Sequence, residues 1–340
     1  MRTPFEDGFT FPAEWTPHAT TLLAWPYAAD LWEERLAAAQ TEWVALCRSI
    51  NRGEPLTVLV PDAEEETAAR AALGDVDVTF WRIGFGDIWM RDIAPLVLTK
   101  GASRASAVFR FNGWGGKYEL PGDDAVSAKA ADALGFDRYE APFVMEGGSV
   151  DVDGEGTVLT TEQCLLNDNR NPGRSRMQIE ADLRDYLGAK KTVWITEGLA
   201  NDHTDGHVDT IARFVRPGVV MVMAPSGDDP NRDVLEKIAR EVEAATDAAG
   251  RKLEVVRIPS PGRLIGDDGE VMPASYVNFY IGNRTVTVPQ YGTDYDRPAL
   301  DAIAKVFPDR EVVGASARAI LEGGGAFHCI TQQVPKGAST

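Results

Sequence analysis

The chain has 340 residues, of which 44% are hydrophobic and 25% charged, and its formal net charge is −18. The hydrophobic content excludes an intrinsically disordered protein. The acidic balance argues against a nucleic-acid partner, because such a surface needs clustered Lys and Arg. It would suit a small cationic substrate, since an acidic cleft concentrates cations, although solubility alone would also account for it.

Strand-like segments recur along the chain. They are rich in β-branched and aromatic residues and are bounded by Gly, Pro or Asn, which is typical of strands. The segment IGNRTV, which spans the junction of the last two, predicts a hairpin turn. In chain order the predicted strands are residues 20–25, 56–60, 76–81, 106–111, 219–224, 276–282 and 284–288.

Helical patterns alternate with these strands, and each repeats apolar residues at a spacing of three or four. The predicted helices are residues 30–50, 62–73, 123–134, 175–187, 231–249 and 297–307. Helices interleaved with groups of strands predict an α/β or α+β fold. No Pro- or Ser-rich linker divides the chain, so we expect one domain, residues 1–340, whose last few residues form a flexible tail.

The cysteines and the N-terminus predict a cytoplasmic protein. Cys47, Cys164 and Cys329 lie far apart and form no CxxC pair, so neither a zinc knuckle nor a disulfide framework is indicated. The N-terminal residues lack the basic and apolar regions of a secretory signal. No apolar stretch approaches the roughly 20 residues that span a bilayer, so we expect no membrane partner.

Four segments combine glycine with ionisable residues: GDIWMRDIAP, MEGGSVDVDGEGT, NDHTDGHVDT and LEGGGAFHCITQQ. In the third, His203 and His207 could share a metal on a helix, but Gly206 favours a loop that leads into a strand. On that strand His207 and Asp209 would share one face. A histidine beside a carboxylate can act as a general base, and two hydrogen-bonded loop histidines are the alternative.

The other segments suggest a nucleophile and a cation site. Cys329 follows closely spaced glycine amides and a histidine, which help a thiol to ionise, although a buried inert cysteine is the alternative. Asp87, Trp89 and Asp92 offer carboxylates and an aromatic face to a planar cation; the alternative is a surface ion pair beside a core tryptophan. Glu146 adds a carboxylate on a tight turn, which could also be a simple hairpin.

A thiol, a histidine and at least three carboxylates are the groups needed to attack a guanidinium carbon. In this respect the chain resembles the agmatine deiminases of the guanidino-group-modifying (pentein) superfamily, which are related to bacterial peptidylarginine deiminases. The resemblance covers nearly the whole chain, in the family's order. The motifs that carry it are PAEWTPHATTLLAWP, WMRD, EGGS, VDGEGT, NDNRNP, GHVD and HCITQQ.

The resemblance implies a five-bladed α/β propeller of ββαβ repeats with pseudo-fivefold symmetry. It implies Cys329 as the nucleophile, His207 as the general acid and base, and Glu146 as the residue that orients His207. Asp92 and Asp209 would hold the guanidinium. The substrate channel would be lined by Trp89, Asp87 and Gly325.

The implied reaction hydrolyses agmatine to N-carbamoylputrescine and ammonia through a covalent amidino-cysteine, with no metal or organic cofactor. The partner would be a small cationic guanidine, and the resemblance is compatible with a homo-oligomer. Several positions depart from the family pattern: Ala94, Asp151, Asp205, Thr210, Ala326 and Phe327. None belongs to the implied catalytic set, and we expect those near Cys329 and His207 to affect the substrate pocket rather than the chemistry.

Three alternatives remain open. A deiminase or amidinotransferase acting on another guanidine would use the same residues. The segments DGHVD and SVDVD are similar to motifs of metal-dependent ureohydrolases, which use two manganese ions, but here they occur in the reverse order. A non-catalytic protein that binds polyamines is the third alternative.

Overall fold

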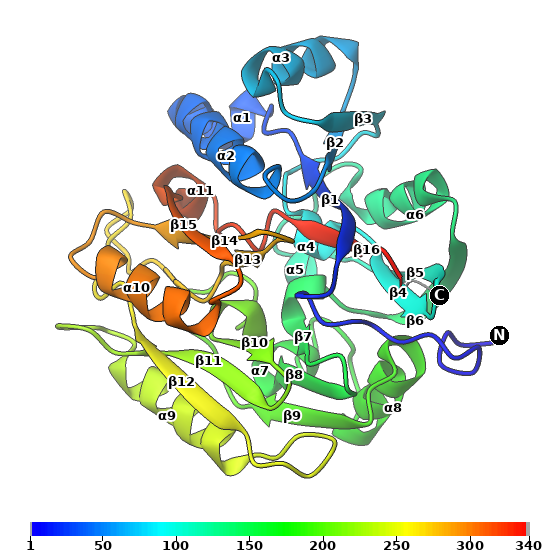
Figure 1. Ribbon diagram of the computed structural model, residues 1–340, viewed down its shortest axis with the longest axis vertical. Coiled ribbons are helices and arrows are strands. Elements are labelled where there is room, and N and C mark those ends of the chain that lie inside the picture. The colour runs from blue at the N-terminus through cyan, green and yellow to red at the C-terminus, as the bar shows by residue number, and fades with distance from the viewer. Residues whose placement is uncertain (1, 338–340) are drawn as a thin grey trace.

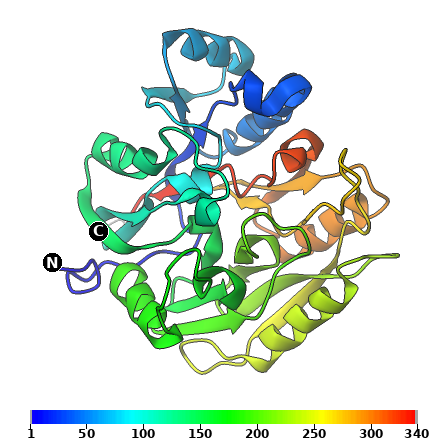
Figure 2. The same cartoon turned by 180° about the vertical axis from the view of Figure 1, so that it is seen from behind.

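The computed structural model describes residues 2–337, and these residues form five separate sheets with the longer helices around the outside (Figure 1). Figure 2 shows the same peripheral placement of the helices from behind. Mixed α/β architecture was predicted and is confirmed. The expected C-terminal tail falls mainly on residues 338–340, which lie outside the described residues.

Four sheets repeat one strand order. In each, the first two strands are antiparallel, and a helix follows the second and leads to a third, parallel strand. The four sheets are β4 (Leu96–Lys100), β5 (Ser103–Arg110) and β6 (Asp137–Val144); β7 (Val150–Val152), β8 (Thr157–Thr161) and β9 (Lys191–Ile195); β10 (Ala212–Arg216), β11 (Val219–Ala224) and β12 (Glu254–Pro259); and β13 (Tyr280–Ile281), β14 (Thr285–Gln290) and β15 (Glu311–Ser316). Their connecting helices are α6 (Asp123–Leu134), α8 (Arg176–Leu187), α9 (Arg232–Ala244) and α10 (Asp296–Val306).

The fifth sheet joins the two ends of the chain. Its strands are β16 (Gln332–Pro335), β1 (His18–Ala24), β2 (Leu56–Val60) and β3 (Val78–Arg82). β16 runs antiparallel to β1, with Gln333 opposite Thr21. β1, β2 and β3 run parallel and are connected by α1 (Ala29–Trp32), η1 (Glu33–Arg35), α2 (Leu36–Ile50) and α3 (Ala63–Leu73). Because Cys329 lies just before β16, this pairing holds it near the middle of the molecule.

Short helical turns lie between the sheets and carry many of the polar residues described below. They are α4 (Met90–Ile93), α5 (Gly113–Gly116), η2 (Gly147–Ser149), α7 (Glu162–Leu165), η3 (Val208–Thr210) and α11 (Arg318–Glu322).

Local sequence signals explain several helix boundaries. Asp62 caps α3 by accepting hydrogen bonds from the amides of Glu64 and Glu65, and Ser175 opens α8 with a capping box to Gln178. The expected hairpin turns are also confirmed, since β7 pairs with β8 across the VDGEGT segment and β13 with β14 across residues 282–284.

Four predicted elements are wrong in extent or type. The helix at 30–50 is broken at Glu33, whose backbone has φ +51°. The helix at 231–249 ends at Ala244, because Asp247 accepts backbone hydrogen bonds from Ala249 and Arg251 and stabilises a turn instead. The strand at 276–282 is reduced to β13. The strand expected from His207 begins only at Ala212, and residues 208–210 form η3.

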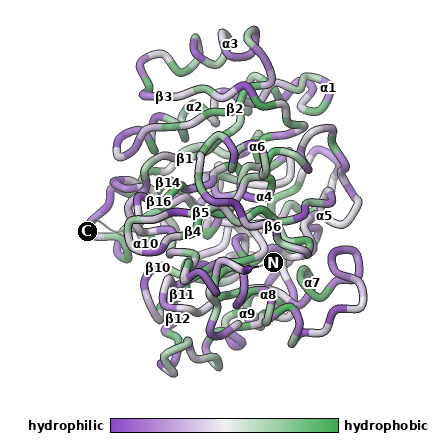
Figure 3. The backbone as a smooth tube through the Cα atoms, turned by 90° about the vertical axis from the view of Figure 1, so that its right-hand side faces the viewer, coloured by the Kyte–Doolittle hydropathy of each residue, from purple (hydrophilic) through white to green (hydrophobic). Residues whose placement is uncertain are grey.

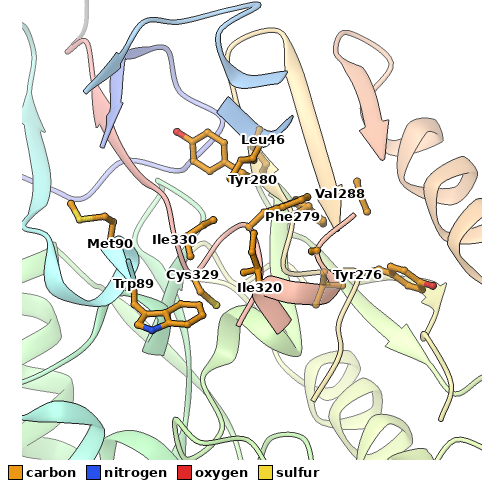
Figure 4. Packing of buried hydrophobic residues seen from close by; sticks show 14 of the residues in the cluster. Leu46, Trp89, Met90, Tyr276, Phe279, Tyr280, Val288, Ile320, Cys329 and Ile330 are labelled. Atoms are coloured by element: carbon orange, nitrogen blue, oxygen red, sulfur yellow. The ribbon is translucent and has the colours of Figure 1, made fainter. Parts of the chain in front are cut away.

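Buried hydrophobic side chains of the described residues form two clusters. The larger includes Trp43, Trp89, Ile320 and Cys329, and the smaller lies mainly on the β4–β6 and β7–β9 sheets with α8. Figure 4 shows part of the larger cluster around Cys329, and Figure 3 shows hydrophilic stretches at many outer turns. Among residues 2–337, no helix combines the length and apolar character that a membrane crossing would need.

The pairing of β1 with its neighbours should depend on its apolar side chains. Leu22 is fully buried and lies opposite Thr57 and Gln332. We expect Leu22→Ala to lower the free energy of unfolding by about 2–5 kcal/mol, because the cavity would be only partly refilled. Urea denaturation measures this. Met177→Ala, at a side chain that is 76% exposed, should change the free energy of unfolding by less than ~0.5 kcal/mol. Equal losses in the two variants would contradict the stabilising role of the buried Leu22 side chain.

Candidate active site

Cys329 lies in the turn between α11 and β16 and is 7% exposed. The amide of Asn278 donates to its Sγ at 3.2 Å, and the Asn278 Oδ1 lies 3.4 Å from the same sulfur. Asn278 Oδ1 also accepts from the backbone N–H of His328 at 3.1 Å. Asn278 therefore pairs with the turn that holds Cys329. It lies outside β13, which is shorter than the predicted strand at 276–282.

A cavity of about 240 Å³ opens beside Cys329. Aromatic rings make much of its wall, and carboxylates and one cation complete it. The lining includes Trp32, Trp89, Trp114, Tyr118, Asp87, Asp92, Glu322, Arg35, His203 and Cys329. A smaller space continues from it past His207, Asp209, Asn278 and Gly325. The cavity therefore ends at the sulfur of Cys329, and the predicted site residues lie around that end.

Asp92 is placed by α4, and both of its oxygens accept hydrogen bonds. The backbone N–H of Gly148 donates to Oδ1 and the indole N–H of Trp114 donates to Oδ2, each at 2.9 Å. A Cβ on Gly148 would lie 2.6 Å from His207 Nδ1, so only glycine fits the EGGS turn here. Burial raises the pKa of Asp92 to about 6; nearby Asp209 and Glu146 also raise it, while His207 lowers it.

His207 lies between two buried carboxylates. Its Nδ1 is 3.8 Å from Asp92 Oδ1, and its Nε2 is 3.8 Å from Glu146 Oε2. Burial alone would lower the pKa of His207, but Asp92, Cys164 and Glu146 outweigh it and raise that pKa well above its usual value. His207 is therefore an imidazolium at neutral pH and can supply a proton. Its Nε2 has no hydrogen-bond partner among the described residues.

Glu146 is fully buried and ionised. Burial would raise its pKa, but His207 and Arg170 outweigh this and lower it. The Arg170 Nε donates to Glu146 Oε1 at 2.7 Å, and a second nitrogen of Arg170 donates to Asp205 at 2.6 Å. Arg170 thus fixes Glu146 on the side away from His207. Asp205, one of the departures from the family pattern, also accepts from Lys117 and anchors this loop.

Asp209 belongs to η3, so the prediction that it shares a strand face with His207 is wrong. The two side chains meet because the turn of η3 brings them to the same cavity. Asp209 Oδ2 accepts from His328 Nδ1 at 2.6 Å and lies 3.8 Å from Cys329 Sγ. Its Oδ1 is buried and without a partner in the described part of the chain. Burial would raise the pKa of Asp209, but His328 outweighs this and lowers it.

Asp87 and Trp89 line the cavity together. Asp87 accepts from the indole N–H of Trp89 at 2.6 Å and from that of Trp32 at 3.0 Å. The two indole rings are stacked, with centroids 6.2 Å apart. Burial raises the pKa of Asp87 to about 6. The pair presents an aromatic surface backed by a carboxylate, which suits an alkyl cation.

Gly325 lies where a side chain would not fit. A Cβ there would approach Trp89 Cζ3 to 2.6 Å and the Cβ of Cys329 to 3.0 Å. Figure 4 shows the Trp89 ring next to Cys329. Gly325 therefore allows the Trp89 ring to pack directly against the turn that holds Cys329.

The thiol of Cys329 is held in its neutral form. Burial raises its pKa well above the usual value, and the charges of Asp209 and Asp92 raise it further. The backbone at Ala326 and the amide of Asn278 oppose this. At neutral pH this arrangement therefore favours the thiol over the thiolate.

One cluster has the donor atoms of a metal site. Glu146, Cys164 and His207 offer ligand atoms within 4.8 Å of one another. A divalent cation there would face the Arg170 guanidinium, which contacts Glu146 directly. The SVDVD carboxylates are committed elsewhere: Asp151 pairs with Arg213 at 3.0 Å, and Asp153 accepts backbone hydrogen bonds within the β7–β8 turn. The donor set thus fits a protonated imidazole better than a metal pair.

The departures from the family pattern have different surroundings. Asp151 and Phe327 are buried and line neither of the two spaces beside Cys329. Asp151 pairs with Arg213, and Phe327, which we expected to affect the pocket, packs in the core instead. Ala326 and Thr210 line the smaller space. Ala94 is the C-terminal cap of α4 and also lines neither space.

Several residues of this site were not predicted. Asn278 lay within an apolar segment, and its single polar side chain was the only signal. Trp114 stands among glycines, in a turn where it has φ +52°, and that unusual setting could have marked it. Arg170 lies in the NDNRNP motif, but its role depends on Glu146, which is distant in the sequence. Trp32 lay in the predicted helix at 30–50, and no functional role was predicted for it.

Comparisons with known proteins agree with this geometry. The family model described as Porphyromonas-type peptidyl-arginine deiminase matches residues 10–335. An agmatine deiminase of Stutzerimonas stutzeri is 41% identical, over 98% of this chain and 97% of that protein. The solved agmatine deiminase of Enterococcus faecalis has a TM-score of 0.94 at 33% identity and covers 98% of both chains. A cysteine-to-serine variant of the C. jejuni agmatine deiminase, solved with substrate bound, has a TM-score of 0.88 at 26% identity and covers 97% of both.

Removing the amide of Asn278 should make Cys329 harder to ionise. We expect Asn278→Ala to slow alkylation of Cys329 by iodoacetamide roughly tenfold to a hundredfold, because a hydrogen bond to an ionised sulfur is lost. Mass spectrometry of the Cys329 peptide measures the rate and separates it from Cys47 and Cys164. In the wild type the rate should still rise as the pH passes 9, since the thiol pKa lies well above that value.

Asn283→Ala is the matched control, because the side chain of Asn283 binds the backbone of His18 instead of the sulfur. It should leave the alkylation rate within about twofold of the wild type, since its hydrogen bonds do not reach Sγ. Equal rates in Asn278→Ala and the wild type would show that the amide does not stabilise the thiolate.

Proposed function

The chain belongs to the Porphyromonas-type peptidyl-arginine deiminase family, and on this basis we propose that it is an agmatine deiminase, a hydrolase of a guanidinium C–N bond. Relatives that carry this name match nearly the whole chain. One structural observation supports the proposal most directly. The buried Asp209, whose Oδ2 lies 3.8 Å from Cys329 Sγ, has an Oδ1 with no partner among the described residues.

We propose that Asp92 and Asp209 hold the guanidinium. Both are buried next to Cys329, and a carboxylate can take paired N–H bonds from a planar cation. The bound cation would compensate the two charges that raise the pKa of Cys329. The substrate thus promotes loss of the thiol proton to solvent, and the thiolate forms when its target is in place.

The chemistry then follows from the remaining groups. The Cys329 thiolate forms a bond to the guanidinium carbon, and His207 donates a proton to the nitrogen that leaves as ammonia. The resulting amidino-thioether is attacked by water, from which His207 takes a proton. The C–S bond breaks, and the sulfur leaves as the thiolate. Glu146, fixed by Arg170, would keep the imidazole oriented and charged.

The rest of the cavity favours an amine tail over an amino-acid tail. Trp32 and Trp89 would flank the methylene chain, and Asp87 lies behind them. Agmatine ends in an ammonium, which this wall attracts. The α-carboxylate of arginine would instead meet Asp87 and Glu322. The lining cation, Arg35, is already paired with Asp267 at 3.3 Å.

The proposal also covers the fold, the partner and the location of the protein. We propose that the five sheets are the blades of a five-bladed α/β propeller with pseudo-fivefold symmetry, because each contains an antiparallel strand pair followed by a helix and a parallel strand. We also propose a small cationic guanidine as the partner, in keeping with the net charge of −18, and a reducing cytoplasm as the location, since a free thiol carries the reaction.

Incubation with a panel of guanidines tests the activity. We expect ammonia and N-carbamoylputrescine from agmatine, and at least about a hundredfold lower kcat/KM for arginine, because its carboxylate would lie beside buried acidic groups. Cys329→Ser should retain agmatine binding and lose at least ~10³-fold in kcat. Turnover of arginine in preference to agmatine would contradict the substrate assignment.

Added amines and chelators separate the alternatives. Transfer of the amidino group to an added amine would identify an amidinotransferase. Urea as the product, with loss of activity on chelation, would identify a ureohydrolase. Binding of agmatine without release of ammonia would leave a binding protein.

The pH dependence should report Asp92. Its pKa is raised to about 6, so the carboxylate is ionised above this pH and takes up a proton as the pH falls through it. We expect kcat/KM for agmatine to decline below about pH 6, because a neutral Asp92 no longer attracts the guanidinium. Asp92→Asn should be almost inactive throughout. A kcat/KM that stays constant down to pH 4.5 would exclude this role.

A further inference from the structure

The residue before the nucleophile, His328, lies between two carboxylates. It is 2% exposed, with Nδ1 at 2.6 Å from Asp209 Oδ2 and Nε2 at 2.7 Å from Glu14 Oε2. It lines neither space beside Cys329. Its imidazole therefore does not reach the substrate position and can act only through Asp209.

Both of its neighbours are ionised and can only accept hydrogen bonds. Burial would raise the pKa of Glu14, but Arg213, His328 and Arg91 outweigh this and lower it well below the usual value. The pKa of Asp209 is lowered as well, despite its burial. An ionised carboxylate has no proton to give. Both ring nitrogens of His328 lie within hydrogen-bond distance of a carboxylate oxygen, so both are placed to donate, as they can in an imidazolium.

We propose that His328 is a positioning residue that holds Asp209 by Oδ2 and so leaves Oδ1 turned toward the guanidinium. This inference rests on the proposed function for its consequence, because Asp209 Oδ1 is the buried atom that has no partner among the described residues. A carboxylate bound on one side by a fixed cation keeps one rotamer and its charge. Substrate then meets an acceptor that needs no reorganisation.

Glu14, the second carboxylate that contacts His328, is itself held by other parts of the protein. Glu14 accepts from the backbone of Ile281 at 2.8 Å and pairs with Arg213 at 3.0 Å and Arg91 at 3.3 Å. Arg91 also donates to the backbone carbonyl of His328 at 3.3 Å. Glu14 is thus held by groups from three other segments, and His328 transmits that position to Asp209.

Five charged or titratable groups face Asp209. They are His328, His207, Arg213, Cys329 and Asp92. Only His328 makes a short hydrogen bond to Asp209. Loss of the His328 charge should therefore raise the pKa of Asp209, while His207 and Arg213 continue to lower it.

A second buried histidine supplies a matched control. His18 is fully buried, contacts Glu54 Oε1 through Nδ1 at 2.9 Å and contacts the backbone carbonyl of Glu14 through Nε2 at 2.6 Å. It resembles His328 in burial and in having two acceptors. It makes no hydrogen bond to Asp209, so a purely structural effect of losing such a histidine should appear in His18→Gln as well.

The protonation state can be measured in the wild type without turnover. The chain has four histidines, so the ring nitrogen signals of a labelled sample can be assigned with His18→Gln, His203→Gln and His328→Gln. We expect both ring nitrogens of His328 to be protonated at pH 7.5. A neutral tautomer at His328 would overturn the inference, whether or not agmatine is the substrate.

Kinetics test the positioning role. We expect His328→Gln to raise the KM for agmatine roughly tenfold to a hundredfold, because a charge-assisted bond that fixes Asp209 is lost, with a smaller change in kcat. The acidic decline of kcat/KM should move to higher pH, because the pKa of Asp209 rises. His18→Gln should change neither. An unaltered KM in folded His328→Gln, or equal changes in both variants, would overturn the role. Failure of the wild type to turn over any guanidine would instead contradict the proposed function.

Discussion

The burial of three carboxylates around Cys329 and His207 is the constraint on which the rest of the site depends. Asp92, Glu146 and Asp209 are at most 7% exposed, and an unpaired buried charge costs several kcal/mol. Each is therefore held by fixed groups: Asp92 by a backbone amide and an indole, Glu146 by Arg170, and Asp209 by His328. The positions that these partners leave unoccupied define where a cation can bind.

This arrangement links binding to reactivity. The same negative charges that attract a guanidinium also keep the Cys329 thiol protonated. A neutral thiol is a weak nucleophile and a poor target for oxidation. In the proposed function a bound cation would offset the carboxylates and favour the thiolate, and the same balance keeps the pKa of His207 raised.

The framework that holds these groups joins distant parts of the chain. Asp92 comes from a short helix after β3, Glu146 and Asp209 from turns of other sheets, and Cys329 from the segment before β16. The pairing of β16 with β1 brings the C-terminal segment back to the first sheet. Glycines at 148 and 325 allow the turns and the Trp89 wall to pack closely at the centre.

The sequence by itself determined the local features and the chemical character of the protein. Caps such as Asp62 and Ser175, the hairpin at VDGEGT and the alternation of strands with helices are short-range signals that can be read within a few residues. The glycine-rich motifs also predicted a site made of a thiol, a histidine and several carboxylates, a combination that has few uses. Their partners did not follow from the motifs.

Only the tertiary structure decided which groups meet and in what charge state. The expected strand at His207 is instead η3, since His207 and Asp209 are placed by contacts with Asp92, Glu146 and His328 rather than by strand alternation. Asn278 contacts a sulfur that is far away in the sequence. Asp151, which differs from the family pattern, proved to be a buried partner of Arg213. Burial and long-range pairing set these properties, and neither can be read from neighbouring residues.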